Sequence, residues 1–224
     1  MSILTPGLQA VLFDLDGVII DSEPLHVKAL QSTCDRFGFT LLPEDVVRFK
    51  GITETQVAQH YLDGQATLTV QDFVTHKSEV YTRLVERELV LIDGVLDFMQ
   101  FCRARHWRLG LTTSALRGNA ATVLKKFHLE SGFEVIVTGG DVKQGKPHPE
   151  PYLITAQKLG LHPAACLVIE DSINGVRSAK AAGCLVLGIT TSFARHELDA
   201  AGANWVVDSF AEARQLVFGQ DLQD

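Results

Sequence analysis

Six short apolar runs, separated by longer stretches that mostly have helical spacing, form the main pattern of this 224-residue chain. The first run, 10–13, reads Ala-Val-Leu-Phe and ends at Asp14. A short continuous apolar run predicts a strand that is buried on both faces, as in a parallel sheet. Strands that alternate with helices predict a parallel sheet with helices on both sides. The other runs are 109–112, 135–137, 167–169, 185–187 and 205–207.

The segment from residue 22 to residue 87 differs, because none of it has the pattern of a strand. Ser22-Glu23-Pro24 predicts a helix start, with a capping serine and a proline in the first turn, and Gly38 predicts the end of that helix. Further helices are predicted to begin near Pro43, at a capping box from Thr53, and at Thr69.

We therefore expect an α/β fold in which a helical module is inserted after the first strand. Residues 1–19 and 90–224 would form the α/β core, and residues 20–89 would form an all-helical cap. The hinges between the two parts are expected near residues 18–21 and 88–94.

Two carboxylates follow the first strand in Asp14-Leu15-Asp16-Gly17. Open parallel sheets bind ligands beyond the carboxyl ends of their strands, and Gly17 allows the chain to turn sharply there. Two neighbouring carboxylates need a proton or a cation, and a hard cation such as Mg²⁺ suits oxygen ligands. Asp-Gly is also typical of hairpin turns and Asp-x-Asp of calcium loops, but the residues that follow continue neither pattern.

Other strand ends supply groups that the same chemistry can use. Thr113-Ser114 follows one strand, Glu170-Asp171 follows another, and Lys146 lies in a Gly-Lys-Pro loop. Each has a simpler explanation as a helix cap or a solvated lysine. Together, acids for a metal ion and hydroxyls and a lysine for anionic oxygens indicate phosphoryl transfer, in which positioning and charge neutralisation dominate.

A nucleotide-binding loop is the main competing interpretation of the lysine. The segment 140–146 matches the first seven positions of Gly-x-x-x-x-Gly-Lys, but Pro147 stands where Ser or Thr should hold magnesium. Proline offers neither a hydroxyl nor an amide hydrogen, so we reject this interpretation.

The composition narrows the class of protein. A net charge of −7 without a basic cluster argues against a nucleic-acid partner. The apolar run near the start is interrupted by Asp14 and lacks a basic lead, so it does not have the pattern of a signal peptide. No apolar run approaches the roughly 20 residues that span a bilayer, so no membrane-spanning helix is predicted. We expect a monomeric cytoplasmic protein whose cysteines are buried and reduced, namely Cys34, Cys102, Cys166 and Cys184.

At this point the chain resembles the haloacid dehalogenase superfamily of phosphotransferases over nearly its whole length. Asp14-Leu15-Asp16-Gly17, the strand-ending Thr113, Gly145-Lys146-Pro147 and Glu170-Asp171-Ser172 match the four motifs of that superfamily in order. The helical insertion resembles the subfamily with a small helical cap, which includes β-phosphoglucomutase and many sugar-phosphate phosphatases. The resemblance implies a Rossmann-like core and Mg²⁺ as the cofactor.

The resemblance also implies the roles of the site residues. Asp14 would be the nucleophile that forms an aspartyl-phosphate, and Asp16 the general acid and then the base. Mg²⁺ would be held by Asp14, by the backbone carbonyl of Asp16 and by Asp171, with Glu170 as a direct or indirect partner. The transferring phosphate would be bound by Thr113, Ser114 and Lys146.

In the cap, the resemblance implies that His26, Gly51 and Lys77 face the substrate, although exposed helical side chains explain His26 and Lys77 equally well. The chain has Glu54 where the mutases carry a phosphate-binding arginine. A second departure, Asp93-Gly94 in place of Pro-Gly, concerns only the hinge. We therefore expect a magnesium-dependent phosphatase that acts on a small phosphorylated metabolite, a sugar or polyol monophosphate. The alternatives are a β-phosphoglucomutase-type isomerase and a non-catalytic binding protein with the same fold.

Overall fold

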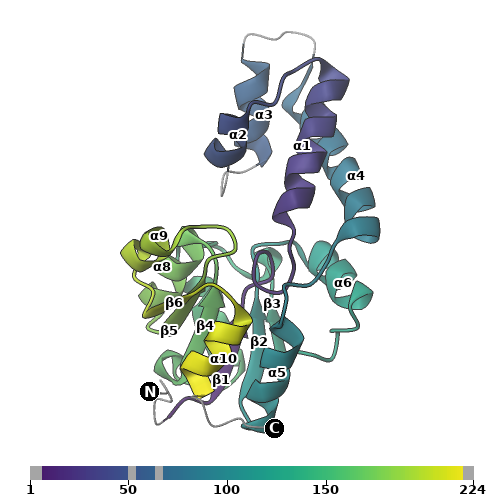
Figure 1. Cartoon of the computed structure of the whole chain (residues 1–224). Coiled ribbons are helices and arrows are strands. Elements are labelled where there is room, and N and C mark those ends of the chain that lie inside the picture. Colours follow the sequence, from purple (N-terminus) through teal and green to yellow (C-terminus); the bar gives the residue numbers. More distant parts are fainter. Residues whose placement is uncertain (1–6, 50–53, 64–67, 219–224) are drawn as a thin grey trace. The chain divides into compact units, whose positions relative to one another are not determined.

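The computed structural model describes residues 7–49, 54–63 and 68–218. The chain divides into two compact units, one formed by Met1–Asp21 with Leu91–Asp224 and the other by Ser22–Val90. We call the first the core and the second the cap (Figure 1).

The core contains a six-stranded sheet in the order β3-β2-β1-β4-β5-β6, in which every neighbouring pair is parallel. β1 lies in the middle, with Phe13 opposite Leu111 of β2 and Ile169 of β4. Residues that follow these three strands therefore meet at one edge of the sheet. The strands are β1 (Ala10–Phe13), β2 (Arg108–Thr112), β3 (Val135–Val137), β4 (Cys166–Glu170), β5 (Leu185–Ile189) and β6 (Trp205–Val207).

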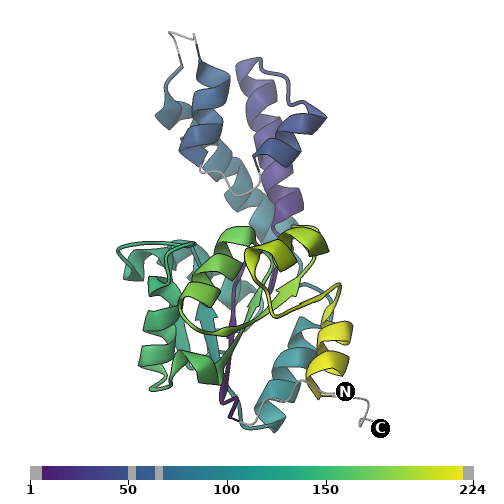
Figure 2. The same ribbon diagram turned by 90° about the vertical axis from the view of Figure 1, so that its left-hand side faces the viewer.

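Helices cover both faces of the sheet, as Figure 2 shows from the side. On one face, α5 (Val95–Ala104) and α10 (Phe210–Phe218) pack through Phe98, whose ring contacts those of Phe13 and Phe210. On the other face, Leu12 of β1 joins one buried cluster with side chains of α7, α8 and α9. Alternate residues of β1 are thus buried on opposite sides, as the continuous apolar run predicts. These helices are α7 (Glu150–Lys158), α8 (Ile173–Ala181) and α9 (Arg195–Ala201).

The predicted fold class, a Rossmann-like parallel sheet flanked by helices, is confirmed. The helical spacing of the sequence predicts helices over 119–127 and 172–182, and α6 (Arg117–Lys126) and α8 begin and end within two residues of these bounds. Four helices of the core were not predicted, namely the α-helices α9 and α10 and the short 3₁₀ helices Gly139–Asp141 and Pro163–Ala165.

The cap has its own core. α1 packs against α4, and α3 packs against α4. The described part of this unit contains helices and connecting segments but no strand. Its buried side chains include Leu30, Cys34, Val57 and Phe73, and partly buried aromatic and aliphatic side chains pack against them. The helices are α1 (Glu23–Phe37), α2 (Pro43–Arg48), α3 (Glu54–Leu62) and α4 (Val70–Glu88).

The ends of the cap helices test the sequence signals one by one. α1 begins at Glu23 and ends before Gly38, whose φ of +76° is the left-handed conformation that favours glycine. The Ser22 side chain does not cap the helix as predicted, because the Ser22 backbone is already helical (φ −92°, ψ −20°). Thr69 does cap α4, in a reciprocal box with Asp72. The predicted box at Thr53 lies outside the described residues.

All four cysteines are buried and unpaired. Burial raises the pKa of the Cys102 and Cys184 thiols to about 12 and that of Cys166 to about 11, so these side chains behave as small apolar groups. Within the described ranges, no helix has both the length and the apolar character needed to cross a membrane.

Candidate active site

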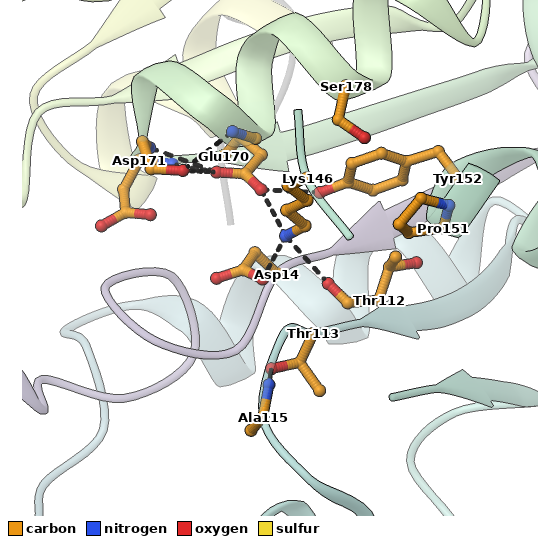
Figure 3. Close-up of polar contacts among 12 residues, drawn as sticks. Asp14, Thr112, Thr113, Ala115, Lys146, Pro151, Tyr152, Glu170, Asp171 and Ser178 are labelled. Carbon is orange, nitrogen blue, oxygen red and sulfur yellow. Dashed lines mark hydrogen bonds and ion pairs between the residues drawn. The ribbon is translucent and has the colours of Figure 1, made fainter. Parts of the chain in front are cut away.

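Three carboxylates come together at the carboxyl ends of β1 and β4 (Figure 3). Asp14 directly follows β1, Glu170 is the last residue of β4, and Asp171 comes next. Each offers an oxygen, and the three oxygens lie within 4.8 Å of one another. The three residues are only 7%, 0% and 4% exposed, respectively. The sheet order explains this meeting, because β1 and β4 are hydrogen-bonded neighbours.

Lys146 reaches this cluster from the loop that precedes α7. Its Nζ donates to Asp14 Oδ1 and to Glu170 Oε1, both at 2.5 Å, and to the carbonyl of Thr112 at 3.2 Å. Only 7% of the Lys146 side chain is exposed. One ammonium therefore faces three carboxylates, so the ionised cluster carries an excess of negative charge.

Burial and mutual repulsion change the proton affinities in the cluster. Burial raises the pKa of Asp14 to about 7, against the opposing effect of Lys146 and with Glu170 and Asp16 adding to the rise. Burial and the charges of Glu170 and Asp14 raise the pKa of Asp171 well above its usual value. Burial alone would lower the pKa of Lys146, but the two carboxylates outweigh it and raise that pKa. The lysine is thus firmly protonated, whereas the acids need more positive charge than it supplies.

The residues present fit a hard divalent cation. The donors are carboxylate oxygens, which Mg²⁺ prefers, and a divalent ion would offset their excess charge. Gly17 allows the turn after Asp14 to approach Asp171, because a Cβ at Gly17 would lie 1.8 Å from Asp171 Oδ2. Gly17 also has a φ of +73°. A larger residue here would push apart the two segments that supply the candidate metal ligands.

Glu170 is held by more partners than the other two acids. Oε2 accepts hydrogen bonds from the backbone N–H groups of Asp171 and Ser172, each at 3.1 Å, and from Ser172 Oγ at 2.9 Å. Oε1 accepts from Lys146 and from the hydroxyl of Tyr152 at 2.7 Å. A Cβ at Gly175 would lie 1.8 Å from Oε1. The Ser172-x-x-Gly175 spacing thus gives Glu170 both a donor and the space that its carboxylate fills.

Asp16 is half-buried in the turn that follows Asp14. That turn is closed by Gly17 N–H, which donates to the Ile20 carbonyl at 2.8 Å, and by Thr191 Oγ1, which donates to the Gly17 carbonyl at 2.5 Å. The charge of Asp16 contributes to the raised pKa of Asp14. The Asp16 side chain does not belong to the three-carboxylate group found among the described residues.

Thr113 and Ser114 lie at the carboxyl end of β2, the strand next to β1. The backbone N–H of Thr113 extends the ladder to Val137 at 2.9 Å, and its Oγ1 accepts from the N–H of Ala115 at 3.0 Å. Ser114 is exposed. These hydroxyls are on the predicted edge of the sheet, while Thr113 is also used in a local turn.

The predicted cap residues form a separate cluster within the cap. Lys77 is 5% exposed, and its Nζ donates to Glu54 Oε1 at 2.5 Å. The His26 ring stacks on Tyr81 with 4.1 Å between centroids. Burial and the charge of Lys77 lower the pKa of His26 to about 3, so its imidazole is neutral near pH 7. Gly51 lies outside the described residues.

Sequence reasoning missed one residue that contacts both Lys146 and its partner Glu170, namely Tyr152. Tyr152 is completely buried, its hydroxyl bonds Glu170, and its ring centroid lies 5.1 Å from Lys146 Nζ. An aromatic residue on the apolar face of a helix is usually a core residue, so the sequence alone gave no reason to place Tyr152 in the site. The one available signal was that a buried tyrosine hydroxyl needs a polar partner.

Known proteins are similar to this chain in sequence and in fold. A model of the haloacid dehalogenase-like hydrolase family matches residues 11–189. A phosphorylated carbohydrates phosphatase from Thermotoga maritima is 32% identical over 177 residues, which cover 79% of this chain and 82% of that protein. The crystal structure of a putative β-phosphoglucomutase from Thermotoga maritima has a TM-score of 0.79 and 31% identity, covering 89% of this chain and 94% of that one.

A second similar structure is that of a CbbY mutant from Rhodobacter sphaeroides in complex with xylulose-(1,5)bisphosphate. Its TM-score is 0.78 and its identity 29%, over 96% of this chain and 100% of that chain. A parallel sheet whose central strand ends at a lysine-bound carboxylate cluster indicates an α/β enzyme of phosphoryl transfer. The chain belongs to the haloacid dehalogenase-like hydrolase family. The sequence prediction of that family, and of a phosphoric monoester hydrolase, is confirmed.

Proposed function

We propose that this protein is a magnesium-dependent phosphatase that hydrolyses a sugar or polyol monophosphate through an aspartyl-phosphate on Asp14. The observation that carries the proposal is the buried Lys146 ammonium 2.5 Å from Asp14 Oδ1, within a cluster of three carboxylates. The Thermotoga maritima relative, a phosphorylated carbohydrates phosphatase, supports the class of substrate. The net charge of −7 favours a small metabolite over a nucleic acid.

In the first step, a carboxylate oxygen of Asp14 attacks phosphorus and the bond from phosphorus to the ester oxygen breaks. Lys146 fixes Oδ1 and leaves Oδ2 for the attack. Asp16 donates its proton to the departing alkoxide, so that a neutral alcohol leaves and Asp16 becomes a carboxylate. Asp14 now carries the phosphoryl group.

In the second step, the Asp16 carboxylate takes a proton from water as the water oxygen attacks the phosphorus of the aspartyl-phosphate. The bond from phosphorus to Asp14 breaks, inorganic phosphate leaves, and both aspartates return to their starting states. Thr113 and Ser114 follow β2 at the edge of the sheet where β1 also ends, and Lys146 reaches the same edge from the loop before α7. These three residues are proposed to bind the phosphate oxygens.

Asp14, Asp171 and the backbone carbonyl of Asp16 are proposed to hold Mg²⁺, with Glu170 as a supporting acid. When bound, the ion neutralises negative charge on the carboxylates and the phosphate. Glu170 already accepts bonds on both oxygens from Lys146, Tyr152, Asp171 and Ser172, which favours an indirect role.

The cap is proposed to select the part of the substrate that is not transferred. Glu54 cancels the charge of Lys77, so this pair supplies no spare cation for a second phosphate. A neutral His26 can exchange hydrogen bonds with hydroxyls. Both features favour a monophosphate with a hydroxyl-rich body. Gly51 stays a predicted contact of this part of the substrate.

A mutase or bisphosphate phosphatase is the second candidate, because the similar structures include a putative β-phosphoglucomutase and a CbbY mutant in complex with a bisphosphorylated sugar. The two functions separate in one experiment. The enzyme is incubated with β-glucose 1-phosphate, Mg²⁺ and a trace of glucose 1,6-bisphosphate, and glucose 6-phosphate and free phosphate are followed together. A phosphatase releases phosphate without accumulating glucose 6-phosphate, whereas a mutase accumulates glucose 6-phosphate much faster.

The substrate itself is found by measuring phosphate release from a panel of sugar and polyol monophosphates, with xylulose 1,5-bisphosphate included as the bisphosphate. The proposal expects the highest kcat/KM on a monophosphate. If no member of the panel is hydrolysed above the rate of an Asp14→Asn preparation, the protein is not a phosphatase of this class of substrate.

A further inference from the structure

The Lys146 ammonium is fixed by a second layer of contacts that comes from α7. Tyr152, in the first turn of that helix, is 0% exposed. Its hydroxyl lies 2.7 Å from Glu170 Oε1, the same oxygen that accepts from Lys146 Nζ at 2.5 Å. The Tyr152 ring centroid lies 5.1 Å from that Nζ, so the ring contacts the ammonium as well as its partner (Figure 3).

Tyr152 thus contacts the ammonium itself and Glu170, one of the three groups that bind it. Without its hydroxyl, Glu170 Oε1 would accept from Lys146 alone, and the carboxylate could move toward the lysine. The charge on Asp14 would then compete less well for the ammonium. A shift of the ammonium matters because reacting groups must be held within a fraction of an ångström for efficient group transfer.

The rest of the loop that carries Lys146 is tied down independently of Tyr152. Glu150 accepts bonds from the N–H groups of Lys143 and Gln144 at 2.8 and 3.0 Å. Ser178 Oγ donates to the His148 carbonyl at 2.6 Å. The loop therefore keeps its path when the Tyr152 hydroxyl is removed, and the change is confined to the end of the lysine side chain.

We propose that Tyr152 is a positioning residue for phosphoryl transfer, which acts through Glu170 to aim the Lys146 ammonium at Asp14. This inference rests on the proposed phosphatase function. Tyr152 itself touches neither the substrate nor the reacting atoms, so it sets the rate of transfer more than the strength of substrate binding.

The test compares Tyr152→Phe with Thr155→Val, a matched change on the same helix. Thr155 is also 0% exposed, and its hydroxyl bonds Thr112 Oγ1 at 2.7 Å and the Pro151 carbonyl at 2.9 Å. Each variant loses one buried hydroxyl, so both should be destabilised toward urea to a similar extent. For Tyr152→Phe we expect kcat to fall about 10-fold with KM changed less than 3-fold. For Thr155→Val we expect kcat within about 2-fold of the wild type.

A second comparison repeats Tyr152→Phe in a Lys146→Ala protein, assayed at high enzyme concentration with p-nitrophenyl phosphate. If Tyr152 acts through Lys146, its removal should change the residual kcat less than about 2-fold in that background. A loss of equal size with and without Lys146, equal losses for Tyr152→Phe and Thr155→Val, or no loss for Tyr152→Phe would each overturn the inference. Failure of the proposed function would look different, because the wild type itself would then release no phosphate.

Discussion

The core and the cap each bury one lysine against a carboxylate, and the two pairs are built differently. The side chains of Lys146 and Lys77 are each 7% exposed. Lys146 bonds two buried carboxylates, whereas Lys77 bonds Glu54, whose side chain is 45% exposed. The number and burial of the acids therefore distinguish the two sites, although their cations are equally buried.

This difference predicts that the two sites bind ligands of different charge. In the core, a cluster of three carboxylates includes one ammonium, which bonds two of them, and the surplus of negative charge calls for a cation. In the cap, the one carboxylate of Glu54 cancels the one ammonium of Lys77, so this pair leaves no positive charge for a further anion. The core is thus suited to a metal ion and the cap to an uncharged group.

The largest effect is expected from Asp14→Asn, which removes the proposed nucleophile. Phosphate release should fall at least about 1,000-fold, because an amide oxygen attacks phosphorus poorly. Far-UV circular dichroism should be unchanged, since Asn has the same shape. Asp16→Ala is the matched change, and its loss should be much smaller on p-nitrophenyl phosphate, whose leaving group needs no proton. Residual activity above about 1% in Asp14→Asn would assign the nucleophile elsewhere.

A chelator should abolish activity, and Mg²⁺ should restore it. Thermal unfolding is measured in the same samples. Mg²⁺ should raise the Tm of the wild type, since it binds only the folded state. Asp171→Asn should remove most activity, raise the Tm in chelator by a few degrees because one buried charge is gone, and abolish the response to Mg²⁺. Full activity in excess chelator would refute the metal assignment.

Glu54→Arg should convert the cap pair into a site for anions. We expect the affinity for a bisphosphorylated sugar, measured as an inhibition constant, to improve about 10-fold, since an arginine fork binds phosphate in two places. Glu88→Arg is the matched control, because it makes the same change of charge at a residue that pairs with Lys28 in the cap and is 42% exposed. If both variants change the inhibition constant equally, the effect is one of net charge and not of the Lys77 pair.

The smallest effect concerns stability and pH at Asp141. The Thr138 hydroxyl and N–H and the Arg117 guanidinium lower the pKa of Asp141 to about 2, opposite to the rise at Asp14. A lowered folded-state pKa contributes stability above the ordinary value of 3.8 that is lost as the pH falls toward 2. Asp141→Asn should therefore cost about 1 kcal/mol of unfolding free energy at pH 6 and much less near pH 2.5. Urea titrations at both pH values test this, and a cost independent of pH would contradict it.

The fold was accessible from the sequence because its strands are continuous apolar runs that need no long-range information to detect. The regions that were missed have weaker signals. α9 is a short helix whose one buried side chain is Leu198, too few apolar positions to show a period. Ser22 failed as a cap because capping depends on the dihedral angles of the residue, which its identity does not determine.

The candidate site was predictable to the extent that it follows strand ends. Asp14, Glu170 and Asp171 were expected together, since parallel strands end at the same edge, and they are together. Tyr152 was not expected, because its role depends on which side of α7 faces the sheet. The five hydrogen bonds of Glu170 were not expected either, because they require the space that glycine leaves at position 175. That position comes next to Glu170 only through the fold of the first turn of α8.

The two chain segments that join the cap to the core run beside each other, with Ile92 N–H donating to the Ile19 carbonyl at 2.9 Å and Ile20 paired with Leu91. Lys28, near the start of α1, and Glu88, the last residue of α4, form an ion pair. The chain therefore enters and leaves the cap through two segments that lie side by side. Once the cap has folded, the chain between β1 and β2 behaves as a much shorter loop, which lowers the entropy cost of closing it by roughly 1 kcal/mol. The insertion therefore adds many residues between the paired strands β1 and β2 but adds little to the entropy cost of pairing them.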